Sequence, residues 1–216
     1  MVNYGMTWVR TIFFPSLHFI PCLVIPCLAA GLLLAPRTAS AQLVVTGPPG
    51  PASAALSAWY GRHVPARFRA KEQFEVYPMT ESRLASYLQN AGRDGNSDQS
   101  SHSDDGSIDG IFEDNPPRIT LLVPEKGAPD LFTFAHEYGH YVWYDILSKD
   151  DRSRYEGIYK KQKSARHLVT RYAEADTEEG FAEAFSFYAA EPSLLHRRDG
   201  ASYQFLAQWT APFPNP

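Results

Sequence analysis

One short segment constrains the fold more than any other part of the chain: residues 134–143, FAHEYGHYVW. It lies in a run that Asp130 can cap, and apolar side chains such as Phe134 and Trp143 cover more than one face of a helix there. A helix that is apolar on most sides belongs in a protein interior. Its histidines would then be buried, and buried polar groups need partners. The sequence therefore predicts a buried helix that runs to about Leu147 and carries two partnered imidazoles.

The two histidines have the spacing of a metal site. Residues four apart lie on one side of a helix, about 6 Å from each other, so His136 and His140 can hold one ion together. Glu137 points about 100° around the helix, which suits a general base that acts on a metal-activated water. A catalytic zinc site has three protein ligands, and Trp143 and Ile146 stand where one common extended motif needs Gly and a third His. A downstream carboxylate is then the expected third ligand. An ordinary amphipathic helix with two histidines is the alternative.

An acidic segment downstream, residues 174–185, offers several carboxylates, and it predicts a helix from near Thr177 that ends before Pro192. In that helix Glu179 and Glu183 share a face. Carboxylates among phenylalanines are costly unless they meet a cation or hydrogen-bond donors. A metal ion can compensate one of them, and the second ring N–H of a ligand histidine can compensate the other. Solvated acidic residues on an exposed face are the alternative. The candidates are Glu174, Asp176, Glu178, Glu179 and Glu183.

These two segments, HEYGH and RYAEADTEEGFAEAF, resemble the catalytic domain of anthrax lethal factor and its relatives, which include the bacterial Pro-Pro endopeptidases. The resemblance covers about residues 108 to 208. It implies a zincin-like metallopeptidase in which His136, His140 and Glu179 bind Zn²⁺. It also implies that Glu137 activates a zinc-bound water as general base.

The same resemblance implies that Tyr172 faces the metal and donates a hydrogen bond to the reacting carbonyl oxygen. Glu183 is then expected to support a ligand histidine. Because this set of three ligands is complete, His63, His167 and His196 are not expected to bind the metal. His102, in a loop rich in Asp and Ser, is expected to be an exposed histidine.

The first 41 residues contain no Asp or Glu, and an apolar run from about Leu17 to Leu34 precedes the small residues Ala39-Ser40-Ala41. This pattern predicts a signal peptide that is cleaved after Ala41, and so a secreted or periplasmic protein. Prolines interrupt the apolar run, so no stable membrane span is expected after cleavage. An uncleaved N-terminal anchor is the alternative.

Cleavage would remove both cysteines, Cys22 and Cys27, and so exclude disulfides, a thiol nucleophile and a Cys-ligated zinc from the mature chain. Loss of Arg10 and Arg37 from the 20 basic residues leaves 18 against 24 acidic ones, a formal charge of −6. Such an acidic protein has no general reason to bind nucleic acid. The expected partner is a protein or peptide substrate, and the sequence does not predict the oligomeric state.

The chain order predicts a single α+β domain over residues 53–216, preceded by an extended leader at 42–52. Helices come first, a small sheet lies in the middle around residues 110–125, and the C-terminal half is helical. Residues 91–110, rich in Asp and Ser, predict a flexible surface insertion.

Together these features predict a secreted zinc-dependent endopeptidase, with proline-rich proteins as first targets to test. The alternative is an exported zinc-binding or adhesive module that keeps a protease fold without turnover.

Overall fold

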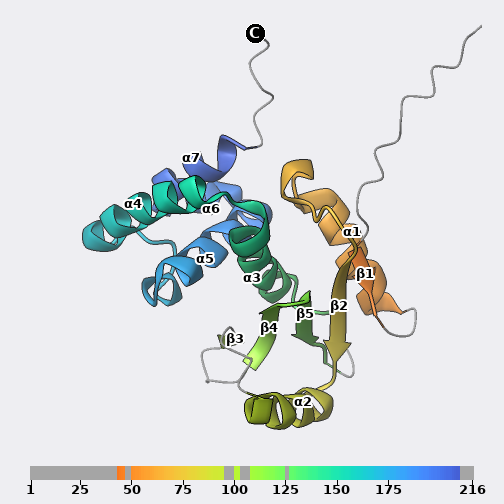
Figure 1. Cartoon of the computed structure of the whole chain (residues 1–216). Coiled ribbons are helices and arrows are strands. Elements are labelled where there is room, and N and C mark those ends of the chain that lie inside the picture. The colour runs from red at the N-terminus through yellow and green to blue at the C-terminus, as the bar shows by residue number, and fades with distance from the viewer. Residues whose placement is uncertain (1–42, 47–49, 95–99, 103–107, 125–126, 210–216) are drawn as a thin grey trace, which may run out of the picture. The chain divides into compact units, whose positions relative to one another are not determined.

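The computed structural model describes residues 43–46, 50–94, 100–102, 108–124 and 127–209. The predicted signal peptide, residues 1–41, lies outside them. The elements in chain order are β1 (Leu43–Val45), α1 (Pro51–His63), η1 (Ala66–Phe68), β2 (Phe74–Met79), α2 (Glu81–Asp94), β3 (Ser100–His102), β4 (Ile108–Asp114), β5 (Pro117–Leu122), α3 (Leu131–Tyr141), η2 (Val142–Ile146), α4 (Lys149–Ala165), η3 (Tyr172–Glu174), α5 (Thr177–Ala190), α6 (Pro192–Arg198) and α7 (Gly200–Ala207) (Figure 1). Within the described ranges, no helix combines the length and the apolar character that crossing a membrane requires.

The strands form one mixed sheet in the order β1-β2-β5-β4-β3. β1, β2 and β5 run parallel, whereas β4 is antiparallel to both β5 and β3. The α+β class predicted from the sequence is therefore confirmed. The predicted order, with helices before strands, was wrong: β1 and β2 alternate with α1 and α2, because parallel neighbours need a crossover connection.

The segment 42–52, predicted as an extended leader, contributes to this sheet. Leu43–Val45 pairs in parallel with β2, and Leu43 lies opposite Phe74. α1 then begins at Pro51, inside the same segment, because a proline at the first helical position loses no hydrogen bond. Residues 43–45 and 51–52 are thus part of the domain.

The segment 91–110, predicted as an insertion, also carries regular structure at both ends. α2 continues to Asp94, and β3 pairs with β4, which begins at Ile108. The rest of the segment lies outside the described residues, as does the side chain of His102.

α3 occupies the centre of the fold, in contact with β4 and β5 of the sheet and with α5 (Figure 1). Every residue from Thr133 to Tyr141 is buried, as the apolar sequence predicted. The helix is α-helical to Tyr141 and continues as a π-helical turn to Ile146. Tyr138 shows how polar atoms are satisfied in this interior, because its hydroxyl donates to the carbonyl of Phe68 at 2.9 Å.

Candidate metal centre

α3 places the two predicted histidines side by side. Asp130 caps the helix by accepting a hydrogen bond from the backbone N–H of Phe132 at 2.8 Å, as predicted. One turn apart on the buried face, His136 and His140 are only 2% and 1% exposed. Their Nε2 atoms lie 3.2 Å from each other.

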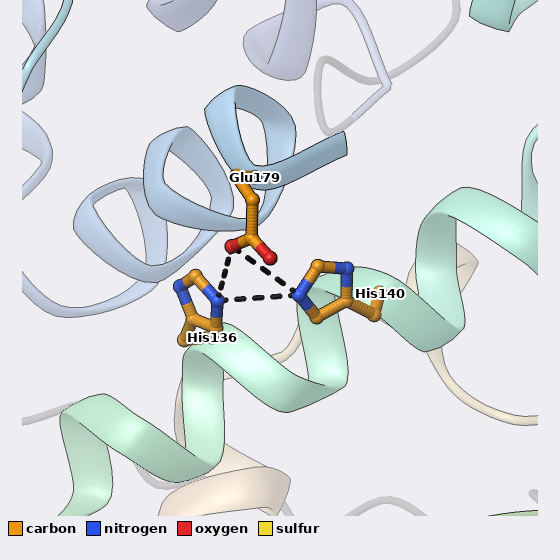
Figure 2. A group of neighbouring side chains, drawn as sticks. All are labelled: His136, His140 and Glu179. Atoms are coloured by element: carbon orange, nitrogen blue, oxygen red, sulfur yellow. Dashed lines mark hydrogen bonds and ion pairs between the residues drawn. The ribbon is translucent and has the colours of Figure 1, made fainter. Parts of the chain in front are cut away.

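α5 brings a carboxylate to the same point. Asp176 caps this helix by accepting from the backbone N–H groups of Glu178 and Glu179 at 2.8 and 2.9 Å. The carboxylate of Glu179 points from α5 toward both imidazoles (Figure 2). Its Oε2 lies 3.0 Å from Nε2 of His136 and 3.6 Å from Nε2 of His140.

A glycine sets the distance between the two helices. A Cβ added at Gly139 would lie 2.8 Å from Cα of Ala182 and 3.2 Å from its Cβ. α3 and α5 therefore cross in backbone contact, and only glycine permits that approach. Since Gly139 lies between the two histidines and Ala182 follows Glu179 by three residues, this crossing fixes the width of the site.

The three ligand atoms match the geometry of a zinc site. Their separations are 3.0, 3.2 and 3.6 Å. Ligand atoms of a tetrahedral zinc, with bonds of 2.0–2.1 Å, lie about 3.3 Å apart. Oε2 of Glu179 is buried and accepts no hydrogen bond within the described residues, although His136 lies beside it. Two imidazoles and a carboxylate are ligands that zinc prefers, so the donor set fits this ion. Within the described ranges, no other group of three such residues converges in this way.

A chain of hydrogen bonds orients His136. Its Nδ1 lies 3.0 Å from Oε1 of Glu183, which as a carboxylate can only accept, so Nδ1 carries the proton and Nε2 keeps a lone pair for a metal. The second oxygen of Glu183 accepts from the hydroxyl of Thr170 at 2.6 Å. That hydroxyl in turn accepts from the backbone N–H of Ala173 at 3.0 Å. Glu183, predicted to support a ligand histidine, thus contacts His136, whereas Thr170 had no signal in the sequence.

The metal-free site favours positive charge. Burial lowers the pKa of His136, but its contacts with the carboxylates of Glu179 and Glu183 outweigh burial and raise this pKa to about 10. Burial likewise raises the pKa of Glu179, and its contacts with His136 and His140 bring it down to about 2. Both shifts have one cause, which is a cluster of carboxylates around buried imidazoles.

Glu137 lies on the sheet side of the same helix and is fully buried. A Cβ added at Gly110 of β4 would lie 2.8 Å from Cγ of Glu137 and 3.0 Å from its Oε1. The strand therefore approaches the carboxylate as closely as its backbone allows. The negative charge of Glu137 also acts on His136 and on Tyr172, which places the predicted base near both.

Tyr172, in η3, lies close to the ligand group. Its ring centroid lies 5.6 Å from that of His136. Burial, together with the charges of Glu179 and Glu137, raises the pKa of Tyr172 above its ordinary value. The phenol therefore keeps its proton at neutral pH and can act as a hydrogen-bond donor.

The remaining histidines of the described chain lie elsewhere. Nδ1 of His63 is 3.0 Å from the carbonyl of Ala189, and His196 packs on the ring of Tyr203. His167 is exposed in the loop after α4. None of them belongs to the ligand group.

Comparisons with known proteins give little beyond a weak structural likeness. No protein-family profile matches the sequence, and no curated protein matches it. Among solved structures, a Pro-Pro endopeptidase from Paenibacillus alvei aligns at 20% identity with a TM-score of 0.44, covering 77% of this chain and 96% of that one. A likeness this low shows neither a shared family nor a shared activity, so function rests on the geometry of the site.

Proposed function

We propose that the protein is a zinc-dependent endopeptidase whose metal is held by His136, His140 and Glu179. One observation carries the proposal. Three ligand atoms of the types that zinc prefers converge at tetrahedral separations, while Glu183 holds the proton of His136 on the far nitrogen.

The surrounding residues supply the remaining parts of a hydrolytic site. Zinc bound there would act as a Lewis acid that polarises the peptide carbonyl and makes water acidic. Glu137 accepts the proton of the attacking water and delivers it to the leaving amine, so one water and one peptide bond yield a carboxylic acid and an amine. Tyr172 donates a hydrogen bond to the oxygen of the former carbonyl as negative charge develops there.

Glu137 and Tyr172 also distinguish an enzyme from a module that only binds metal. Neither is among the three converging ligand residues, and a buried carboxylate costs free energy. A base and a protonated phenol close to the ligand group are the parts that hydrolysis requires.

The test is hydrolysis of a mixed peptide library by the zinc-loaded protein and by its Glu137→Gln variant. The variant is expected to bind zinc with unchanged stoichiometry and to lose about 10²–10⁴-fold in rate. Unchanged turnover in the variant would exclude Glu137 as the base. A wild-type protein that binds zinc but cleaves no peptide would instead support the module without turnover.

Two finer proposals concern the substrate and the compartment. Because the motifs around the ligands resemble those of the Pro-Pro endopeptidase group, proline-rich peptides are the first substrates to test. Because residues 1–41 have the composition of a signal peptide, we propose export with cleavage after Ala41. N-terminal sequencing of the protein from culture medium and from periplasmic extract tests the second proposal.

A further inference from the structure

A cavity of about 350 Å³ is lined in part by Thr170, which contacts Glu183 of the candidate metal centre. Its wall is the loop that joins α4 to η3, residues 166–171, and Glu174 and Arg198 complete it. The loop reads RHLVTR and supplies two arginines, and Arg198 is the third, so three guanidinium groups and one imidazole line the cavity, against a single carboxylate. The cavity therefore has an excess of positive charge, although the whole chain has a formal net charge of −4.

The charges of this cavity are not neutralised within the described residues. The side chains of Arg166 and Arg171 form no ion pair or hydrogen bond there, and Arg198 donates only to the carbonyl of Val169, at 3.3 Å. Arginine elsewhere in the fold behaves differently: Arg118 forms a bidentate pair with Glu113 at 2.6 and 2.8 Å. The cavity thus presents guanidinium groups whose donors are available to a ligand.

Helix ends alone do not explain this cluster. Arg166 caps α4 with φ 58°, in the left-handed region where glycine is usual, and a cation there interacts favourably with the helix dipole. That effect falls off within the last turn, so it does not account for Arg171, which lies five residues beyond. It also does not account for Arg198, which comes from α6.

The cavity wall is also part of the site's hydrogen-bond chain. Thr170 lines the cavity and donates to Glu183, which holds His136. Arg171 directly precedes Tyr172 in the sequence. A ligand in the cavity would therefore contact the loop that carries Thr170 and leads directly into Tyr172.

We propose that this cavity binds the oxyanion group of an acidic peptide, with the guanidinium groups of Arg166, Arg171 and Arg198 as its donors. Guanidinium recognises carboxylate and phosphate oxygens by paired hydrogen bonds, which gives the site its chemistry. Because the assignment names a substrate class for the proposed peptidase, it rests on that function, and its test therefore measures binding and hydrolysis separately.

The binding experiment uses the zinc-loaded Glu137→Gln protein, to prevent cleavage, and two fluorescein-labelled peptides that differ only by Gln in place of every Glu. Anisotropy is expected to show binding of the Glu peptide about tenfold or more tighter than that of the Gln peptide. Replacing the three cavity arginines by Gln should abolish this preference. Arg197→Gln is the matched control, since it removes the same charge from the neighbouring exposed position, which does not line the cavity, and it should keep the preference.

Two results would overturn the proposal: no preference for Glu over Gln in the parent protein, or equal loss of that preference in Arg197→Gln. Binding of inorganic phosphate without any preference between the peptides would assign the cavity to a free anion, and so would overturn it as well. Hydrolysis of the two peptides is measured in parallel with Glu137 intact, and Arg197→Gln should keep the wild-type kcat/KM for both. If neither wild type nor any variant hydrolyses a peptide while the Glu preference persists, the proposed peptidase function is refuted and the anion site is supported.

Discussion

Substituting Gly139 by alanine tests whether the crossing of α3 and α5 sets the metal site. The new methyl group would lie 2.8 Å from Cα of Ala182, whereas ordinary contacts begin near 3.4 Å. The two helices would then have to separate by about 0.6 Å, because the opposing atom is backbone and has no rotamer to change. Glu179 lies one turn before the contact and would move with α5.

The expected loss of zinc affinity follows from how little the metal–ligand distances of a metal site can vary. Ligand distances are held to about ±0.2 Å, so a separation of about 0.6 Å exceeds that tolerance threefold. Part of it can be absorbed by the side chain of Glu179, and we expect zinc affinity to fall about 10–100-fold, or about 1.4–2.7 kcal/mol. The free energy of unfolding should change less than the free energy of zinc binding. Alanine gains up to about 1 kcal/mol over glycine in a helix, which offsets part of an overpacking cost of about 1–3 kcal/mol.

The assay is competition for zinc against a chromophoric chelator, with urea unfolding of the metal-free protein measured in parallel. Gly157→Ala is the matched control, because Gly157 is exposed within α4 and an added Cβ meets nothing within 4 Å. This control should gain about 0.5–1 kcal/mol of stability and keep wild-type zinc affinity.

A double variant sharpens the test. Ala182→Gly removes the Cβ at 3.2 Å from the new methyl group but leaves the Cα at 2.8 Å. In the Gly139→Ala background it should therefore restore only part of the zinc affinity. Wild-type affinity in Gly139→Ala itself would show that the helix crossing does not set the ligand distances.

Three further predictions concern neighbouring contacts. Glu183→Gln removes the negative charge that holds the proton of His136 on Nδ1. Chelator competition should therefore show a zinc affinity about 10–100-fold lower. An unchanged affinity would mean that this carboxylate does not orient the imidazole ring. Gly110→Ala would press a methyl group on Glu137, so kcat should fall about tenfold or more with little change in zinc affinity; a proportional loss of both would contradict a selective effect on the base. Glu113 has a pKa that burial raises but that Arg118 and Tyr87 bring below its ordinary value, so its stabilisation is present above pH about 4.3 and is lost as pH falls through the lowered pKa. Urea midpoints of wild type and Glu113→Gln should therefore differ at pH 6 and converge toward acid, and a constant difference would refute the linkage.

Helices could be predicted where caps and apolar runs agree. Asp130 caps α3 as the sequence predicted, and α5 begins at Thr177 as expected, although its cap, Asp176, was not predicted. β2 could not be predicted with the same ease, although Phe74 and Val76 alternate with polar neighbours and are buried. Pro78 lies inside that strand, and a proline normally argues against a strand that has partners on both sides.

Some residues of the candidate site could likewise be predicted from the local sequence, whereas others could be found only from the folded structure. His136 and His140 follow from helical spacing alone, whereas Glu179 and Glu183 remained equivalent candidates on one helix face until a family resemblance separated them. The structure separates them physically, since both oxygens of Glu183 already have donors. One of these donors is Thr170, from a loop that no periodicity connects to α5, and so it could not have been predicted.

The different surroundings of these two carboxylates explain why a cation belongs between α3 and α5. Glu183 is compensated by hydrogen bonds from neutral groups and needs no counter-ion. Oε2 of Glu179 faces the ring nitrogens, and because the proton of His136 is held on Nδ1, its Nε2 offers a lone pair rather than a hydrogen. A buried negative charge that faces a lone pair is unfavourable until a positive charge lies between them. Without metal, a second proton on His136 can supply that charge, as its raised pKa indicates. A divalent ion would compensate all three atoms at once, and the hydrogen bond that holds the proton of His136 on Nδ1 leaves its Nε2 ready to bind the ion.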